Sequence, residues 1–184
     1  MTSINKKDFR TQQLTNLQAA MHTTQAEATV LTNLLFETDI WQTAQTIGTT
    51  ISNPIELPTG GIIERALQDN KQVYLPKTMP HRQMAFLEYP GHSQLVKNSF
   101  RLLEPAYDET KMNQAVDLMI VPGVAFAQDS HYRVGFGGGY YDRFLANYRG
   151  HTVALVPQVM NFETANWPVE DFDIAIDYLI TASN

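Results

Sequence analysis

Residues 133–145, RVGFGGGYYDRFL, place four glycines within five positions, directly before a run of residues typical of a helix. Glycines at a junction between a strand and a helix let backbone N–H groups approach a phosphate, and the start of the helix adds partial positive charge. Arg133 and Arg143 flank the glycines and can add charge-assisted contacts. The alternative is a tight turn without a ligand, which one glycine would usually satisfy. The stretch therefore favours an anion site.

The common phosphate-binding templates do not fit this stretch. A Walker A loop needs Gly-Lys followed by Ser or Thr, and none is present. A dinucleotide fingerprint needs a glycine at position 140 or 142, where Tyr140 and Asp142 stand. Asp142 itself has two interpretations that the sequence leaves open. An aspartate in the first turn of a helix is favoured by the helix dipole, and a carboxylate beside phosphates is also a ligand for Mg²⁺.

The elements that must position this loop follow from the pattern of apolar residues. Residues 115–126 form the most apolar stretch, which is typical of a strand buried on both faces. The sequence TQAE at 24–27 has the form of a capping box. The patterns predict helices at 4–21, 24–37, 61–70, 93–98 and from 140, and strands at 43–52, 71–78, 83–89, 115–126, 151–157 and 172–181.

This alternation of strands and helices predicts an α/β fold, a three-layer α/β/α Rossmann-like domain with a largely parallel central sheet and N-terminal helices. The 184 residues fit one domain, 1–184, with a sizeable core.

Composition narrows the classes of function. The chain has no cysteine, which excludes disulfides, thiolate metal sites and cysteine nucleophiles. The net charge of −6, with 13 basic residues and no dense basic run, argues against a nucleic-acid partner. No apolar run reaches the length of a membrane span, and the polar start MTSINKKDFR lacks a secretory core. We expect a cytoplasmic protein, a monomer or weak homo-oligomer, that binds a small molecule and no membrane.

The segment DLMIVPGVAF followed by RVGFGGGYYDRFL resembles the signature of the 5-formyltetrahydrofolate cyclo-ligase (5,10-methenyltetrahydrofolate synthetase) family. The likeness runs along most of the chain and includes a Lys-x-x-x-Arg at Lys6 and Arg10. Further similar segments are ELPTGGII at 56–63, KQVYLPK at 71–77, Met84 with Phe86, Glu104-Pro105 and DIAID at 173–177. The loop 127–132 and Gly138, where some members carry lysine, depart from the family pattern.

The resemblance implies ATP- and Mg²⁺-dependent conversion of 5-formyltetrahydrofolate to 5,10-methenyltetrahydrofolate. The family pattern implies catalytic roles for Arg133, Tyr140 and Asp142, and Mg²⁺ ligation by Asp142 and Asp173. It implies ATP contacts from Lys6, Arg10, Arg133, Val134, Gly135, Phe136, Gly137, Gly138, Gly139, Tyr140 and Tyr141. It implies folate contacts from Ile51, Glu56, Phe136, Gly137, Gly138, Gly139 and Tyr140.

Without the resemblance, most of these residues have ordinary structural interpretations. Lys6 and Arg10, one helical turn apart, would form a solvated basic face, the aromatic residues would pack in the core, and Asp173 would be a turn residue. Two other functions stay open at this point. The chain could be a paralogue that acts on a different substrate, for example a thiamine-related one, or a folate- or nucleotide-binding protein without catalysis.

Overall fold

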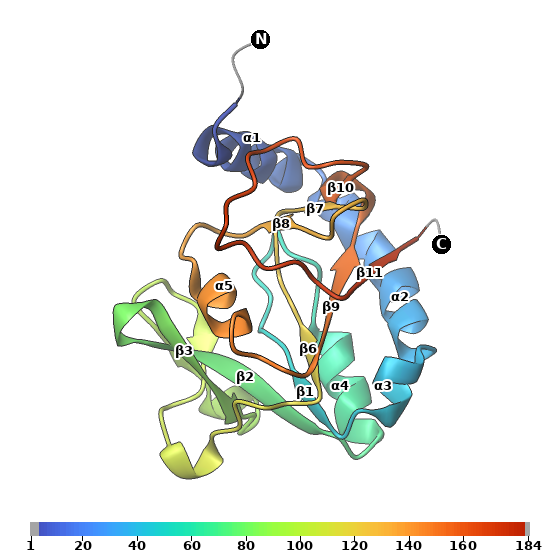
Figure 1. The fold of residues 1–184 in the computed structure, drawn as a ribbon. Coiled ribbons are helices and arrows are strands. Elements are labelled where there is room, and N and C mark those ends of the chain that lie inside the picture. Colours follow the sequence, from blue (N-terminus) through green and yellow to red (C-terminus); the bar gives the residue numbers. More distant parts are fainter. Residues whose placement is uncertain (1–3, 183–184) are drawn as a thin grey trace.

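The computed structural model describes residues 4–182 (Figure 1). The helices are α1 (Lys6–Ala19), α2 (Met21–Phe36), α3 (Asp39–Thr43), α4 (Gly60–Gln68) and α5 (Tyr140–Leu145), with 3₁₀ turns at Pro80–Arg82, His92–Gln94, Glu109–Lys111 and Gln158–Met160. The strands are β1 (Thr46–Gly48), β2 (Gln72–Met79), β3 (Gln83–Glu88), β4 (Val96–Lys97), β5 (Leu103–Glu104), β6 (Leu118–Ile120), β7 (Ala125–Ala127), β8 (Arg133–Val134), β9 (His151–Val156), β10 (Asn161–Phe162) and β11 (Tyr178–Thr181).

The central sheet of the described chain has six strands in the order β11-β9-β6-β1-β2-β3. All neighbouring pairs are parallel except β2 with β3, which form an antiparallel hairpin at one edge. The predicted α/β fold with a largely parallel sheet and N-terminal helices is confirmed. From β1 the chain proceeds to β2 on one side, and from β6 it proceeds to β9 and β11 on the other. The order therefore reverses between β1 and β6, which is where ligands bind in open α/β sheets.

Alternating side chains of the strands build two hydrophobic cores, one on each face of the sheet. In β6, Leu118 and Ile120 point to one face and Met119 to the other, as the two-residue period of a strand requires. Helices α2, α3 and α4 cover the first face, and Figure 1 shows them together on one side of the sheet. Helices α1 and α5 and a small sheet of β10, β7 and β8 cover the second face.

Several predicted elements differ from the structure. The apolar stretch 115–126 is two strands, β6 and β7, in different sheets, because Pro122 and Gly123 end the first strand and redirect the chain. The predicted helix at 93–98 is wrong, since a 3₁₀ turn there leads into β4. The predicted capping box is also wrong. Helix α2 begins at Met21, directly after α1, so Thr24 lies inside it with a buried side chain.

Two predicted strands are shorter than expected. The strand predicted at 43–52 covers only β1, and the strand predicted at 172–181 only β11. Before β11, backbone N–H groups donate to groups outside the sheet: Ile174 donates to the Asp142 carboxylate at 3.3 Å and Ile176 to the His131 carbonyl at 3.0 Å.

Among residues 4–182, no helix is long and apolar enough to cross a membrane.

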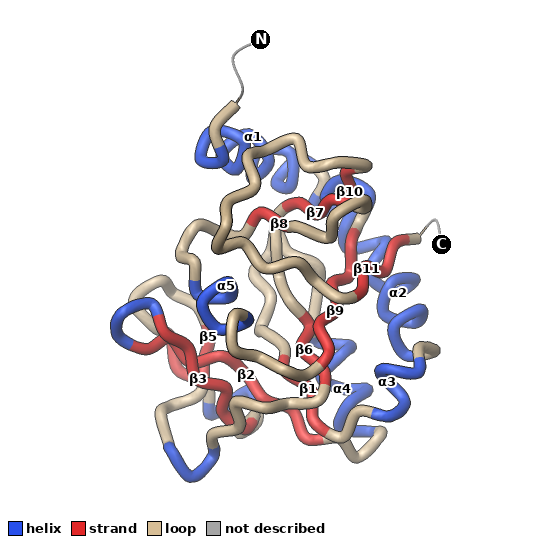
Figure 2. The backbone as a smooth tube through the Cα atoms, viewed as in Figure 1, coloured by secondary structure: helices blue, strands red, loops and turns tan. Residues whose placement is uncertain are grey.

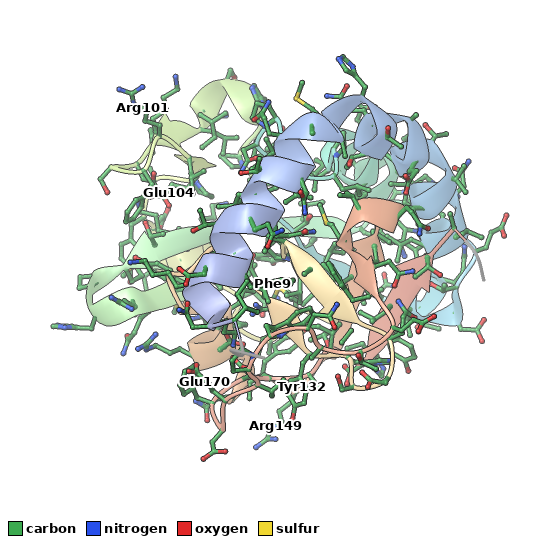
Figure 3. All side chains as sticks on the ribbon, turned by 90° about the horizontal axis from the view of Figure 1, so that it is seen from above. Phe9, Arg101, Glu104, Tyr132, Arg149 and Glu170 are labelled. Atoms are coloured by element: carbon green, nitrogen blue, oxygen red, sulfur yellow. The ribbon has the colours of Figure 1, made fainter. Side chains whose placement is uncertain are left out.

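Helix α1 is fixed to the second core by both apolar and polar contacts. Two of its own side chains, Phe9 and Leu17, are buried in that core, and Phe9 is labelled in Figure 3 beside the helix as it crosses the molecule. The buried amide of Gln13 donates to the carbonyl of Val124 at 2.9 Å and to that of Val159 at 2.7 Å. Lys6, Arg10 and Gln13 are three to four residues apart and share one face of the helix. Gln13 therefore helps to fix how close Lys6 and Arg10 lie to the second core.

Replacing Gln13 by leucine is expected to lower the free energy of unfolding by about 1–3 kcal/mol, because two buried carbonyls lose this donor. The melting temperature should fall by roughly 2–10 °C for a chain of this size. Gln12→Leu is the matched control, since Gln12 lies on the exposed side of the same helix. Urea denaturation of both variants measures the effect. Equal stability of the two variants would contradict the anchoring role.

Candidate active site

A cleft of about 1050 Å³ opens where the strand order reverses. Thr50 and Ile51, beyond the carboxyl end of β1, and Pro122, beyond that of β6, contribute to its wall. The remaining walls come from α1, the glycine loop, the β2–β3 hairpin, the segment 98–104 and the C-terminal segment 170–174. Figure 2 shows that much of the region between α1 and α5 is loop. All the predicted site residues line this cleft except Val134, which is buried in the core on β8.

The glycine loop leaves β8 and enters α5 with close approaches between its backbone and arginine side chains. Gly137 and Gly139 have φ angles of 102° and 69°, in the left-handed region that disfavours other residues. A Cβ atom on three of the glycines would meet a guanidinium nitrogen. The pairs are Gly135 with Nη1 of Arg133 at 2.9 Å, Gly137 with Nη1 of Arg10 at 3.2 Å, and Gly139 with Nη1 of Arg143 at 2.6 Å. The glycines thus let three cations lie directly against the loop.

Arg133 is the central cation of the site. Its side chain is only 2% exposed, and Nη2 donates to the Asp142 carboxylate at 3.3 Å. Burial lowers the pKa of Arg133, while the charges of Asp142, Tyr141 and Asp173 act in the opposite direction. Arginine stays charged in proteins all the same. Its buried Nε is a donor without a hydrogen-bond partner within residues 4–182, and such unsatisfied buried groups are rare in folded proteins.

Lys6 and Arg10 reach the cleft from α1, and both are engaged. The Nζ atom of Lys6 lies 2.5 Å from the buried carboxylate of Asp173. The Nε atom of Arg10 donates to the carbonyl of Gly135 at 2.7 Å. The interpretation of this pair as a solvated basic face is therefore wrong. Helix α1 joins the C-terminal segment and the glycine loop through these two side chains, across 167 and 125 residues of sequence.

Asp142 and Asp173 form the acidic part of the same corner. Asp142 accepts the backbone N–H of Ile174, the residue that follows Asp173. Asp173 also accepts the N–H of Glu170 at 2.9 Å. Within the described part of the chain, no three His, Asp or Glu side chains gather to hold a metal ion by themselves. Two carboxylates fit a Mg²⁺ ion that takes its other ligands from phosphates and water.

Glu56 lies in the loop between β1 and α4. Its Oε2 atom accepts the N–H of Asn53 at 2.7 Å, which fixes the carboxylate in place. Thr59 shapes the same loop, since its hydroxyl donates to the carbonyl of Thr50 at 2.6 Å. Burial raises the pKa of Glu56, and the Asn53 hydrogen bond opposes that rise. A half-buried carboxylate with unused acceptor capacity can accept paired N–H donors of a ligand.

The aromatic residues of the motif have different surroundings. Phe136 is 42% exposed in the cleft wall, and Tyr140 is half-buried with its ring against Gly138. The Tyr141 ring lies 5.8 Å from the guanidinium carbon of Arg133 and edge-on to Phe86. Burial raises the pKa of the Tyr141 hydroxyl, and the nearby charge of Glu56 adds to this rise. Tyr141 is therefore both a packing residue and a lining residue.

Several lining residues are missing from the sequence prediction. Many of them are apolar or acidic and come from two segments: Asn98, Phe100 and Leu102 between β4 and β5, with Leu103 and Glu104 of β5, and Glu170, Asp171, Phe172 and Ile174 of the C-terminal segment. A signal was available for part of the second group, since the exposed Phe172 stands next to Asp173. No spacing rule connects the first group to the cleft.

The fold and the cleft define an α/β protein in which Lys6, Arg10 and Arg133 line a cleft at the reversal of the strand order. A model of the 5-formyltetrahydrofolate cyclo-ligase family matches residues 2–182. The 5-formyltetrahydrofolate cyclo-ligase of Escherichia coli K12 is 33% identical over 145 residues, which cover 76% of this chain and 79% of that protein. The chain belongs to the 5-formyltetrahydrofolate cyclo-ligase family.

Other relatives agree with this assignment. The mitochondrial 5-formyltetrahydrofolate cyclo-ligase of Arabidopsis thaliana is 32% identical over 153 residues, 70% of this chain and 55% of that protein. The solution structure of Aquifex aeolicus 5,10-methenyltetrahydrofolate synthetase superimposes with a TM-score of 0.81 at 25% identity, covering 97% of this chain and 90% of that one. The Mycoplasma pneumoniae synthetase shares the fold, with a TM-score of 0.67 at 18% identity and coverage of 96% and 98%.

Proposed function

We propose that the cleft binds ATP beside 5-formyltetrahydrofolate and converts the folate to 5,10-methenyltetrahydrofolate, with release of ADP and phosphate. Family membership makes this chain an ATP-dependent 5-formyltetrahydrofolate cyclo-ligase of one-carbon metabolism. The observation that carries the detailed proposal is the buried Arg133, which lies against the glycine loop with two carboxylates close by and an Nε that is unpaired among the described residues.

The chemical problem is the poor reactivity of a formamide. Its carbon is a weak electrophile and its oxygen a poor leaving group. Transfer of the γ-phosphoryl group to the formyl oxygen releases ADP and activates the carbon. N10 of the folate then forms a bond to that carbon, and the C–O bond breaks as inorganic phosphate leaves. The nucleophile belongs to the substrate, so the protein needs to position two ligands and neutralise charge.

Arg133, Lys6 and Arg10 would hold the phosphates of ATP, with the N–H groups of residues 135–139. Arg133 packs near the Tyr141 ring and is already buried, so water would screen its charge toward an anion only weakly. Lys6 pairs with Asp173, and Arg10 donates to the carbonyl of Gly135. Nucleotide binding would therefore exchange some of these contacts for contacts to phosphate oxygens.

Asp142 and Asp173 would hold the Mg²⁺ ion. When bound, this ion neutralises charge that develops on the phosphates during transfer. The fit rests on two carboxylates that share a corner of the cleft with the phosphate-binding cations. Each carboxylate is oriented before any ligand arrives, by the N–H of Ile174 and by that of Glu170.

The folate would lie toward Glu56, with the pterin N–H groups donating to its carboxylate. Ile51 and Phe136 line the same cleft and would contact the flat ring system. Tyr140 stands at the start of α5 and lines the cleft, and its hydroxyl would contact the reacting formyl group. We further propose that residues 1–184 act as one domain, as a monomer or weak homo-oligomer in the cytoplasm, and without nucleic acid.

The purified chain, given 5-formyltetrahydrofolate, ATP and Mg²⁺, is expected to form the absorbing methenyl product together with one ADP for each turnover. Omission of ATP or chelation of Mg²⁺ should abolish the signal. A relative of known activity, assayed in parallel, shows that the substrate can react under the same conditions. If ATP binds but no product forms, the folate reaction is refuted and a paralogue with another substrate is favoured.

A further inference from the structure

We infer that Glu104 is a positioning residue for folate: its carboxylate locks the segment 96–104 onto β2 and so holds Phe100 and Leu102 in the wall of the cleft. This inference rests on the proposed folate reaction. Glu104 is only 3% exposed, and four donors surround it. None of its hydrogen bonds within the described chain involves Lys6, Arg10, Arg133, Asp142 or Asp173, and the proposed chemistry gives it no task.

The donors come from two different elements. From β2, the ammonium of Lys77, the N–H of Thr78 at 3.1 Å and the Thr78 hydroxyl at 3.0 Å donate to Glu104. From the segment itself, the side-chain amide of Asn98 donates at 3.1 Å. Hydrogen bonds to a charged, buried acceptor are the strong kind. Glu104 therefore ties the position of Asn98 to the central sheet. In Figure 3, Glu104 lies near the sheet and Arg101 on the outer side of the segment.

Asn98 in turn builds the turn that carries the apolar residues. Its Oδ1 atom accepts the N–H of Phe100 at 2.9 Å and that of Leu102 at 3.0 Å. Its backbone N–H bonds the Leu102 carbonyl at 2.9 Å, and Arg101 closes the turn with a φ of 62°. The two strands β4 and β5 pair over only two residues each. Side-chain contacts to the sheet must therefore supply much of the order of this segment.

The residues that the turn presents are apolar and open to solvent. Phe100 is 63% and Leu102 43% exposed, and both line the cleft. They bring no positive charge for phosphates and suit a flat aromatic ring, which we assign to the folate. Because a flexible wall must be ordered on binding, a fixed wall increases affinity. Loss of the Glu104 contacts should therefore weaken folate binding and leave ATP binding unchanged.

Glu104→Gln and Asn98→Asp test this inference. Glu104→Gln removes the negative charge that pairs with Lys77. Asn98→Asp keeps the Oδ1 atom that accepts the N–H groups of the turn. It replaces the amide group that donates to Glu104 by an oxygen. Each is expected to raise the Kd and KM for 5-formyltetrahydrofolate roughly tenfold, which one lost charge-assisted hydrogen bond can produce. The KM for ATP and kcat should stay within about twofold of wild type. Glu88→Gln, at an exposed carboxylate of the neighbouring β3, is the control.

The outcomes separate this inference from the proposed reaction. A folded Asn98→Asp variant with unchanged folate affinity would overturn the positioning role, and so would equal losses for folate and ATP. Asn98→Asp keeps the trial decisive if Glu104→Gln fails to fold, because Asn98 is only half-buried. A wild-type protein without turnover would refute the reaction, while the ratio of folate Kd values between variant and wild type would still test Glu104.

Discussion

Replacing Asp142 by asparagine is expected to lower kcat by on the order of 10²-fold or more, with a much smaller effect on folding. Changes to groups that merely support a metal ligand cost about 10–100-fold, and a direct ligand should cost at least as much. Asparagine cannot supply the negative charge that a hard cation prefers. The Mg²⁺ concentration for half-maximal activity should also rise.

The expected effect on stability follows from the contacts of one atom. Oδ1 of Asp142 accepts both the Nη2 donor of Arg133 and the N–H of Ile174. Asparagine keeps an oxygen at that position, so both hydrogen bonds can persist while the charge is lost. The loss of charge assistance should cost about 1–3 kcal/mol, or a fall in melting temperature of roughly 2–10 °C. The variant should therefore stay folded at 25 °C.

Asp171→Asn is the matched control for this experiment. Asp171 lines the same cleft, is exposed and lies two residues from Asp173. It should leave kcat and the Mg²⁺ dependence unchanged. The metal role of Asp142 would be refuted by a variant that melts earlier than wild type yet turns over at the wild-type rate and with the same Mg²⁺ dependence.

The paired charges suggest why Mg²⁺ and ATP would bind together. In the structure, Lys6 is bound to Asp173 and Arg133 to Asp142. A nucleotide alone would draw the cations away and leave two carboxylates close to phosphates. A metal ion alone would leave two cations without partners, one of them buried. Both costs vanish when the ion and the phosphates arrive together, so each should raise the affinity of the other.

The sequence predicts the strands of the central sheet well, because strands buried on both faces consist mainly of apolar residues. Runs such as HTVALV in β9 are apolar on both faces, and only a covered parallel strand requires that. The same rule merges β6 with β7, since an apolar run does not reveal a change of sheet. The break at Pro122 is visible in the sequence, but its consequence depends on packing against β8 and β10.

The site was predictable only in part, for a related reason. The glycine loop is contiguous, so local chemistry identifies it, and the resemblance adds Lys6, Glu56 and Asp173. The pairing of Lys6 with Asp173, and the network around Glu104, join residues that the fold alone brings together. The role of the buried Gln13 amide likewise cannot be recognised in the sequence, because its partners are backbone carbonyls that any residue could supply.

Replacing Glu56 by glutamine is expected to raise the Kd for 5-formyltetrahydrofolate by about 10²-fold, without changing the affinity for ATP. A site built to accept hydrogen bonds from a ligand loses much of its affinity when an acceptor becomes a donor. Oε1 of the glutamine can still accept the N–H of Asn53, so the loop should keep its shape. Its NH₂ group would then face the N–H donors of the pterin. Glu64→Gln, at an exposed position on the following helix α4, is the control.

The pH dependence of binding provides an independent readout of Glu56. Burial raises the pKa of this carboxyl above its ordinary value, so protons compete with the folate at a higher pH than for an exposed glutamate. Folate affinity should fall as the pH falls through this raised pKa. Stability of the ligand-free fold should respond oppositely. The neutral form is favoured in the fold, so its contribution is present below the unfolded-state pKa and is lost as the pH rises through the folded-state pKa.

Titration of 5-formyltetrahydrofolate between about pH 5 and 8, without ATP, measures this dependence. Wild type and Glu64→Gln should lose affinity together toward the acidic end, whereas the weak affinity of Glu56→Gln should change only as far as the folate itself titrates. Changes in the folate itself cancel, because they are common to all three proteins. Parallel pH profiles for wild type and Glu56→Gln would contradict the assignment, since binding would then require no proton release from residue 56. The same set therefore separates a carboxylate that receives the pterin from one that only closes its own loop through Asn53.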